Sequence, residues 1–239
     1  MNIYREKLKK YPVHEWTEAG FLLCFLGGFL DAYTFVSRGG VFANAQTGNL
    51  ILLTLGLARG DGAAALRYLV PILFFFAGVI CSRFFLRSER ADAATARGRA
   101  AILIVEAAAL AVAAALPPAV PDHWVTALVA LAAALQFDSF RRLEGMAFAT
   151  AFCTGNLRST TEAFFRLFAR RERAALACAV KYCIVLAGFV GGVLAGYFAT
   201  AAWSNFSAFF CTGLLIFLSG MLLLGDGARR RLSDDGMSA

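Results

Sequence analysis

Two aspartates stand inside otherwise apolar runs, each at the same spacing from a Thr-Gly-Asn tripeptide. Asp31 lies in GGFLDAYTF and Asp138 in ALQFDSF, and the tripeptide begins sixteen positions after each, at residues 47 and 154. An ionisable side chain in an apolar span is costly, so we expect both to face the protein interior and to have a function. Burial favours the neutral form of a carboxylic acid, so either could carry a proton. A structural acid that hydrogen-bonds a neighbouring segment is the alternative.

The two Thr-Gly-Asn tripeptides have the residue types of a turn that begins a helix. Gly permits turns that other residues resist, and Thr and Asn are preferred N-caps. The first N–H groups of a helix lack intrahelical partners and favour anions or polar ligands. An ordinary helix cap remains the alternative, because a duplicated fold would also duplicate its caps. The candidate solute- or ion-binding residues are Asp31, Asn44, Thr47, Gly48, Asn49, Asp138, Thr154, Gly155 and Asn156.

A third intramembrane acid, Glu106, lies in AILIVEAAALAV, and the corresponding residue of the second half is Gly213. Glu106 could serve in coupling or could pair with an arginine. The six cysteines have no CxxC spacing and the two histidines suggest no ligand cluster, so we predict no metal site and no cofactor. No nucleophile stands at helical spacing from a base, and we therefore expect the protein not to be an enzyme.

The elements that would position these residues are membrane spans. The chain has 239 residues, of which 59% are hydrophobic and 16% charged, whereas soluble domains carry about 25% charged residues. A helix needs about 20 apolar residues to cross a bilayer core. We predict an all-α membrane protein with six spans, near Ala19–Ser37, Tyr68–Leu86, Ala100–Leu116, Trp124–Phe140, Cys178–Thr200 and Phe206–Leu224.

The distribution of basic residues predicts the orientation. Cytoplasmic loops are rich in Lys and Arg. Six spans with both ends inside leave only Arg38, Arg59 and Arg67 of the 23 basic residues outside. We therefore predict a multi-pass protein of the bacterial inner membrane with a cytoplasmic arm at residues 1–18 and a cytoplasmic tail at 226–239. Because the net charge of +7 is spread over these loops, we expect no nucleic-acid partner.

A duplication relates the two halves. A shift of 107 residues places Asp31 and the first Thr-Gly-Asn on Asp138 and the second. Each half has three spans, an odd number, so the second repeat (118–225) would enter the membrane inverted relative to the first (19–117), as in many transporters. Residues 39–60 and 145–171 would each form a re-entrant limb, a turn at Thr-Gly-Asn and a short helix. The two limbs would enter from opposite sides and could meet near the middle.

The runs GGFLDAYTF and VFANAQTGNL resemble the first signature of the bacterial YoaK-like membrane family, which is classed as a domain of unknown function. The resemblance extends from about residue 18 to residue 224. It implies a polytopic inner-membrane protein with Asp31, Thr47, Gly48 and Asn49 as signature positions. The second half departs from a simple copy, since Arg141 and Arg142 stand where the first half has Thr34 and Phe35.

These features favour a secondary transporter of a small polar or ionic solute in the lipid bilayer, with protons coupled through Asp31, Asp138 or both. A small-solute or ion channel and a non-transporting scaffold or partner subunit are the alternatives, and a homodimer is compatible with each. A polar cavity that touches both aspartates and both Thr-Gly-Asn tripeptides would favour transport. A sealed midplane would favour the scaffold.

Overall fold

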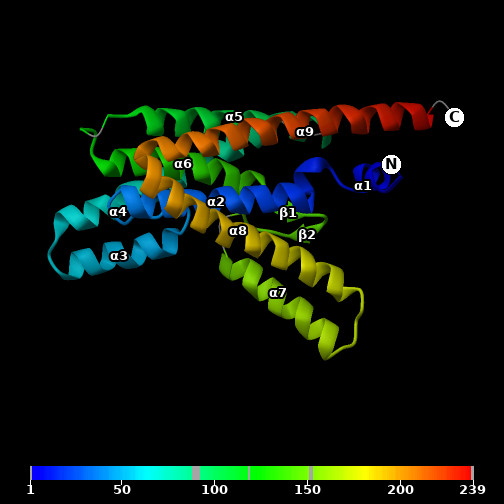
Figure 1. Ribbon diagram of the computed structural model, residues 1–239, viewed down its shortest axis with the longest axis horizontal. Coiled ribbons are helices and arrows are strands. Elements are labelled where there is room, and N and C mark those ends of the chain that lie inside the picture. Colours follow the sequence, from blue (N-terminus) through cyan, green and yellow to red (C-terminus); the bar gives the residue numbers. More distant parts are fainter. Residues whose placement is uncertain (1, 88–91, 118, 151–152, 238–239) are drawn as a thin grey trace.

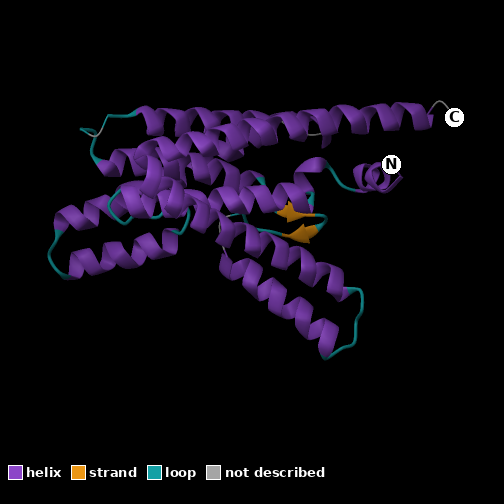
Figure 2. Cartoon of the chain, in the orientation of Figure 1, coloured by secondary structure: helices purple, strands orange, loops and turns teal. Residues whose placement is uncertain are grey.

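The computed structural model describes residues 2–87, 92–117, 119–150 and 153–237, nearly all of them in helices. The predicted repeat boundary at residue 118 lies outside these residues. Besides helices, Figure 2 shows loops and two short strands. The helices are α1 (Asn2–Lys10), α2 (Thr17–Ser37), α3 (Gln46–Ala58), α4 (Gly62–Arg87), α5 (Asp92–Ala115), α6 (Asp122–Ser139), α7 (Cys153–Phe168), α8 (Ala175–Trp203) and α9 (Ala208–Met237), with short 3-10 helices η1 (Val13–Glu15) and η2 (Ser204–Ser207).

Large apolar side chains cover the outside of the long helices. Phe76 of α4 and Phe198 of α8 are both 65% exposed, which is typical of a surface covered by lipid rather than by water. By length and composition, four stretches of the described residues could cross a membrane. They are Thr17–Ser37, Gly62–Leu86, Ala96–Ala115 and Ala175–Leu232. The prediction of an all-α membrane protein agrees with this finding.

Six spans were predicted, whereas this finding identifies four candidate stretches among the described residues. The fourth candidate stretch contains both α8 and α9, joined through η2. Helix α6 is not among the candidates, because Asp122, Gln136 and Asp138 lower the hydropathy of its 18 residues.

The long helices pack in pairs that are distant in sequence. Helix α2 packs on α8, α4 on α6, and α5 on α9, and Figure 1 shows α5 and α9 lying side by side along one edge. Glycines allow the closest of these contacts. A Cβ atom on Gly28 of α2 would run into the carbonyl oxygen of Phe189, and one on Gly192 of α8 into that of Phe25. The backbones of α2 and α8 are therefore in contact.

The two short helices α3 and α7 form hairpins with the long helices that follow them. Helix α3 packs along α4 and α7 along α8, and the two hairpins project in different directions from the body (Figure 1). The ends that carry Thr-Gly-Asn are the ends nearer the middle in that view. Because the helices diverge, a meeting of the two predicted limbs would be confined to the loops that precede them.

A small hairpin follows α6, where an apolar re-entrant limb was predicted. Strand β1 (Arg142–Leu143) pairs antiparallel with β2 (Met146–Ala147). The two residues between them, Glu144 and Gly145, have φ angles of 47° and 82°, the left-handed conformation that tight hairpin turns require at both positions. Strands of two residues are too short to produce a recognisable alternation of polar and apolar residues, so the sequence did not indicate them.

Candidate functional site

Asp31 is buried in α2 and hydrogen-bonded to the loop before α3. The Asn44 N–H donates to its Oδ1 at 2.7 Å, and the N–H groups of Ala45 and Ala43 also face the carboxylate. The Asn44 side chain donates in turn to the carbonyl oxygen of Gly27, at 3.1 Å. Asp31 is only 5% exposed, so its carboxylate is hydrogen-bonded by backbone N–H groups of residues 43–45 in place of water. The loop is thereby tied to the middle of α2.

The prediction that Thr or Asn of each tripeptide caps its helix is wrong. Helix α3 begins at Gln46 and α7 at Cys153, so each Thr-Gly-Asn lies within the first helical turn rather than before it. Ala45 occupies the N-cap position of α3 and makes no side-chain cap. Thr47 and Thr154 are exposed, and neither contributes to the contacts of the aspartates among the described residues.

The asparagine of each tripeptide instead holds the preceding loop. Asn49 accepts a hydrogen bond from the Phe42 N–H at 2.9 Å and donates to the Phe42 carbonyl at 2.7 Å. Asn156 is related to Ala149 in the same way, at 3.4 and 2.8 Å. Both asparagines are buried. Each asparagine side chain hydrogen-bonds the N–H and the carbonyl group of the residue seven positions earlier, as a neighbouring strand would. We call this arrangement the asparagine clamp, and it occurs in both halves.

The glycines of the two tripeptides differ in their surroundings. A Cβ atom on Gly48 would stand 3.0 Å from two ring atoms of Phe42, whereas one on Gly155 would meet no described atom within 4 Å. Gly48 is therefore needed for the Phe42 ring to pack on α3, and the structure shows no such need at Gly155.

Asp138 of α6 has different partners from Asp31, although it is equally buried at 6% exposure. Its Oδ1 lies 2.6 Å from a guanidinium nitrogen of Arg83, and Ser82 donates to its Oδ2 at 3.1 Å. A second arginine, Arg141, lies 3.9 Å from Oδ1. The acid therefore joins the end of α4 to α6 through an ion pair whose arginine side chain is 60% exposed.

Glu106 of α5 is fully buried, and both of its carboxylate oxygens lack a hydrogen-bond partner among the described residues. The thiol of Cys211, in α9, lies close enough to interact with it electrostatically. An unpaired carboxylate is very costly in such surroundings. Glu106 was predicted either to serve in coupling or to pair with an arginine. The described residues place no arginine against it, and they provide no partner for a role in coupling.

A cavity of about 340 Å³ opens beside Asp31. Its lining combines the carboxylate with four aromatic rings, those of Phe35, Phe42, Phe189 and Tyr197. The lining of this cavity includes neither Asp138 nor any residue of either Thr-Gly-Asn tripeptide. The three acids therefore lie in three separate environments, and the candidate site is centred on Asp31.

Polar contacts that were not predicted from the sequence also tie α2 to α6 at both ends. At the end of α2, the buried Arg38 lies 3.3 Å from Asp122, the first residue of α6. Beyond the end of α6, the Gly145 N–H donates to Glu15, just before α2, at 3.3 Å. A shift of 107 residues relates these pairs, with Glu15 matching Asp122 and Arg38 matching Gly145. Applied to Arg38 and Asp122, the shift gives Gly145 and Glu15, so the repeat could have indicated these contacts from the sequence.

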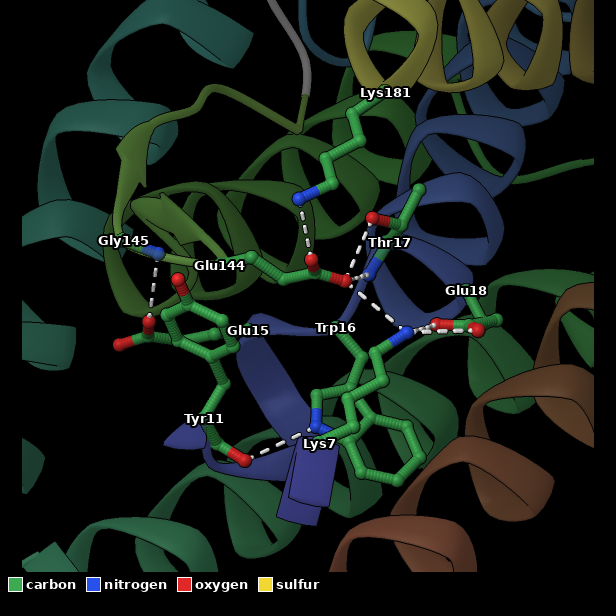
Figure 3. Close-up of polar contacts among 9 residues, drawn as sticks. All are labelled: Lys7, Tyr11, Glu15, Trp16, Thr17, Glu18, Glu144, Gly145 and Lys181. Atoms are coloured by element: carbon green, nitrogen blue, oxygen red, sulfur yellow. Dashed lines mark hydrogen bonds and ion pairs between the residues drawn. The ribbon is translucent and has the colours of Figure 1, made fainter. Parts of the chain in front are cut away.

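The second of these ends carries a larger network, centred on Glu144 (Figure 3). Lys181 of α8 and Lys7 of α1 lie 2.6 and 3.1 Å from its carboxylate oxygens. Thr17, at the start of α2, donates to the same carboxylate through its hydroxyl at 2.9 Å and its N–H at 3.2 Å. Lys7 pairs in addition with Glu18 at 2.6 Å. One carboxylate thus joins the hairpin after α6 to three helices.

The network changes the ionisation of Glu144. Burial by itself would raise the pKa of this carboxyl, but the hydrogen bonds from Lys181, Thr17 and Lys7 outweigh it and lower the pKa to about 2. Partial burial opposes the charge on Lys7, yet its two glutamate partners raise its pKa above the usual 10.5. Both groups are therefore charged at neutral pH.

Comparisons with known proteins agree with the architecture and name no activity. The chain is 28% identical over 157 residues to the UPF0700 transmembrane protein YoaK of Bacillus subtilis (strain 168), an alignment that covers 64% of this chain and 69% of that protein. No solved structure matches the chain. The model of the family described as "Protein of unknown function (DUF1275)" matches residues 19–221. On that match, and in agreement with the resemblance of its signature residues, the chain belongs to the DUF1275 family.

Proposed function

We propose that this protein is a secondary transporter of a small polar or ionic solute, built from two inverted three-span repeats and coupled to protons through Asp31. It would lie in the bacterial inner membrane with six crossings and both termini in the cytoplasm. Figure 1 shows the two termini at the same end of the molecule, which an even number of crossings requires. The burial of a carboxylate in α2, beside a cavity, is the observation that carries the proposal.

The packing of the helices supports an inverted repeat. If α2, α3, α4 and α5 are exchanged with α6, α7, α8 and α9, the pair α2–α8 becomes α6–α4, and α3–α4 becomes α7–α8. The pair α5–α9 becomes α9–α5, which is the same pair. The main contacts of the fold are therefore unchanged by the exchange. Each half donates one helix to the other, so a movement of one half changes the surroundings of Asp31 through α8.

The polar contacts at the two ends of α2 and α6 are suited to act as gates. Both are closed in the structure, since Arg38 contacts Asp122 at one end and Glu144 contacts Lys181 and Lys7 at the other. Alternating access requires that one end open while the other stays closed. Opening the Glu144 end would separate the hairpin after α6 from α2 and α8, and the cavity beside Asp31 lies against these same two helices.

A non-transporting scaffold is the second candidate, and the hydrogen bonds of Asp31 favour it. Its carboxylate already accepts the Asn44 N–H and faces those of Ala43 and Ala45, which is also what a purely structural acid would do. The two candidates differ in whether the protonation of Asp31 moves a solute, so a flux measurement separates them.

Reconstitution in liposomes that hold a pH-sensitive dye tests the proposal. Under an imposed proton gradient, small solutes are screened for proton flux in the wild type and in Asp31→Asn. Asp226→Asn is the matched control, because this acid pairs with Arg230 four residues later in α9 and lies outside the site. Solute-dependent flux that is lost in Asp31→Asn and kept in the control supports coupled transport. Flux that persists in Asp31→Asn excludes this residue as the proton carrier.

A wild type that shows no flux with any solute, together with an Asp31→Asn variant that loses much of its thermal stability, would replace the transporter with the scaffold. The same preparations give both readouts, so loss of fold is not mistaken for loss of transport.

A further inference from the structure

A groove lies between the N-terminal parts of α2 and α8, outside the Asp31 cavity. Its volume is about 940 Å³. One wall is apolar, formed by Phe21 and Leu22 of α2 and by Leu176, Val180 and Ile184 of α8. Leu176, Val180 and Ile184 are 50%, 47% and 39% exposed, so this wall is open to the surroundings of the helices. In a membrane protein those surroundings are acyl chains.

The rim of the groove is charged, and part of it is drawn in Figure 3. Three basic residues line it, namely Lys7, Lys181 and Arg173, together with the acids Glu18 and Glu144. The two lysines pair with the two glutamates at 2.6–3.1 Å. Arg173 is exposed and has no ion-pair partner among the described residues. The rim therefore has one positive charge in excess.

The helix beside the groove has the features of a segment that lies in a membrane surface. On α7, which packs along α8, Leu157, Phe165 and Phe168 are 53%, 57% and 74% exposed. Arginines stand among and just after them, at positions 158, 166, 170, 171 and 173. Helices with exposed apolar residues and a basic polar face bind at the headgroup level of anionic membranes. The rim is thereby placed at that level and the apolar wall deeper.

We propose that the α2–α8 groove binds one phospholipid with an anionic headgroup. An acyl chain would lie along the apolar wall, and the phosphate would contact Arg173 and the lysines. The single excess positive charge of the rim matches the single negative charge of such a lipid. A second copy of this chain fits less well, because it would bring an equally basic rim to the same contact. This proposal does not depend on transport.

Native mass spectrometry of the full-length protein in detergent tests the proposal, with phosphatidylglycerol and phosphatidylcholine of identical acyl chains as probes. We expect one phosphatidylglycerol to bind more tightly than phosphatidylcholine. Arg173→Gln should weaken phosphatidylglycerol about fivefold, since each basic residue near an anionic surface contributes about 1 kcal/mol, and should leave phosphatidylcholine unchanged. Arg170→Gln is the matched control, because Arg170 is three residues away, carries the same charge and does not line the groove.

A second pair of variants tests the apolar wall. Ala177 lines the groove and is exposed, so Ala177→Phe should obstruct the apolar wall and weaken the binding of both lipids. The exposed Ala174, one turn earlier and outside the groove, provides the control variant Ala174→Phe. Unchanged melting temperatures exclude misfolding as the cause.

Three results would overturn the proposal. The first is equal affinity for the two lipids with no effect of Arg173→Gln. The second is binding of both lipids that Ala177→Phe leaves unchanged. The third is displacement of phosphatidylglycerol by soluble glycerophosphoglycerol at similar concentration, which would assign the site to the headgroup alone.

Discussion

The two halves of this protein carry the same aspartate at the same spacing and use it differently. Asp31 is bonded to backbone N–H groups of its own loop, while Asp138 forms an ion pair with Arg83. The asparagine clamps of the two halves, in contrast, have the same design, as do the helix pairs that support them. The two halves thus share the arrangement of the helices and the loop clamps, while the partners of their acids differ.

This difference matters for function, because the two carboxylates are held in unlike ways. The guanidinium of Arg83 places a positive charge against Asp138. The partners of Asp31 among the described residues carry no positive charge: they are backbone N–H groups of residues 43–45, the Asn44 side chain and the Cys153 thiol at the start of α7. A carboxyl group without a counter-ion can gain or lose a proton at lower cost than one in an ion pair. The first half is therefore the better candidate for proton coupling.

The largest expected effect distinguishes the two acids by stability. Asp31→Ala would leave buried backbone N–H groups of residues 43–45 without an acceptor, at a cost of about 1–3 kcal/mol for each group. Asp138→Ala should cost less, because the Arg83 side chain is 60% exposed and can turn to water or to lipid headgroups. Unfolding in mixed micelles measures both changes. Equal losses of stability would contradict the contrast drawn between the halves.

The next effect concerns the helix pairs that the exchange of halves relates. A Cβ atom on Gly192 would collide with the backbone of Phe25, whereas one on the adjacent Gly191 would stand 3.8 Å from the Phe25 ring. Gly192→Ala should therefore destabilise the α2–α8 pair by about 1–3 kcal/mol, as overpacking does. Gly191→Ala serves as the control and should have little effect. Thermal unfolding in detergent checks both, and a stable Gly192→Ala would show that α2 and α8 can separate without loss.

Much of the fold could be predicted because lipid imposes simple constraints. A crossing helix must be long and apolar, and this located the helices that the structure has as α2, α4, α5, α8 and α9. The hairpin β1–β2 could not be predicted, since its strands are only two residues long. The pairing of α2 with α8 was also beyond the sequence. It depends on backbone contact at Gly28 and Gly192, and glycines by themselves do not say which helix they face.

Less of the candidate site could be predicted. The burial of Asp31 and Asp138 followed from their apolar surroundings, and both are buried. The partners did not follow, because Arg83 is 55 residues from Asp138 and only the packing of α4 on α6 brings them together. The role of Asn49 was mistaken for the same kind of reason. A residue suited to capping can satisfy a loop behind it instead, and only the start of α3 at Gln46 decides between the two.

The asparagine clamps allow a finer comparison. Asn49 has three side-chain hydrogen bonds, two to Phe42 and one to Gln46 at 3.0 Å. Among the described residues, Asn156 has two side-chain hydrogen bonds, both to Ala149, and one of them is long at 3.4 Å. We expect Asn49→Ala to cost about 1–2 kcal/mol and Asn156→Ala about 1 kcal/mol. Unfolding in mixed micelles measures the order, and a larger loss for Asn156→Ala would contradict it.

A further effect is a pH dependence at the Glu144 end of the molecule. In the folded protein the pKa of Glu144 is about 2, below its ordinary value of 4.5. A depressed carboxyl pKa contributes stability that is fully present above the unfolded value and is lost as pH falls toward the folded value. Melting temperature in detergent should therefore fall between about pH 4.5 and pH 2 through this group. Lys7, whose pKa is raised above its ordinary value, stays charged over that window and adds no slope of its own.

Glu144→Gln isolates this contribution, because the amide keeps an acceptor oxygen and cannot ionise. The variant should be less stable than the wild type at pH 6, and the difference should shrink as the pH approaches 2. The Arg38–Asp122 contact lies at the other end of α2, so Asp122→Asn provides the comparison between the two ends. If Glu144→Gln keeps the full pH dependence of the wild type, the network around Glu144 does not hold α6 to α2 and α8. The gate proposed for that end would then have no contact that holds it closed.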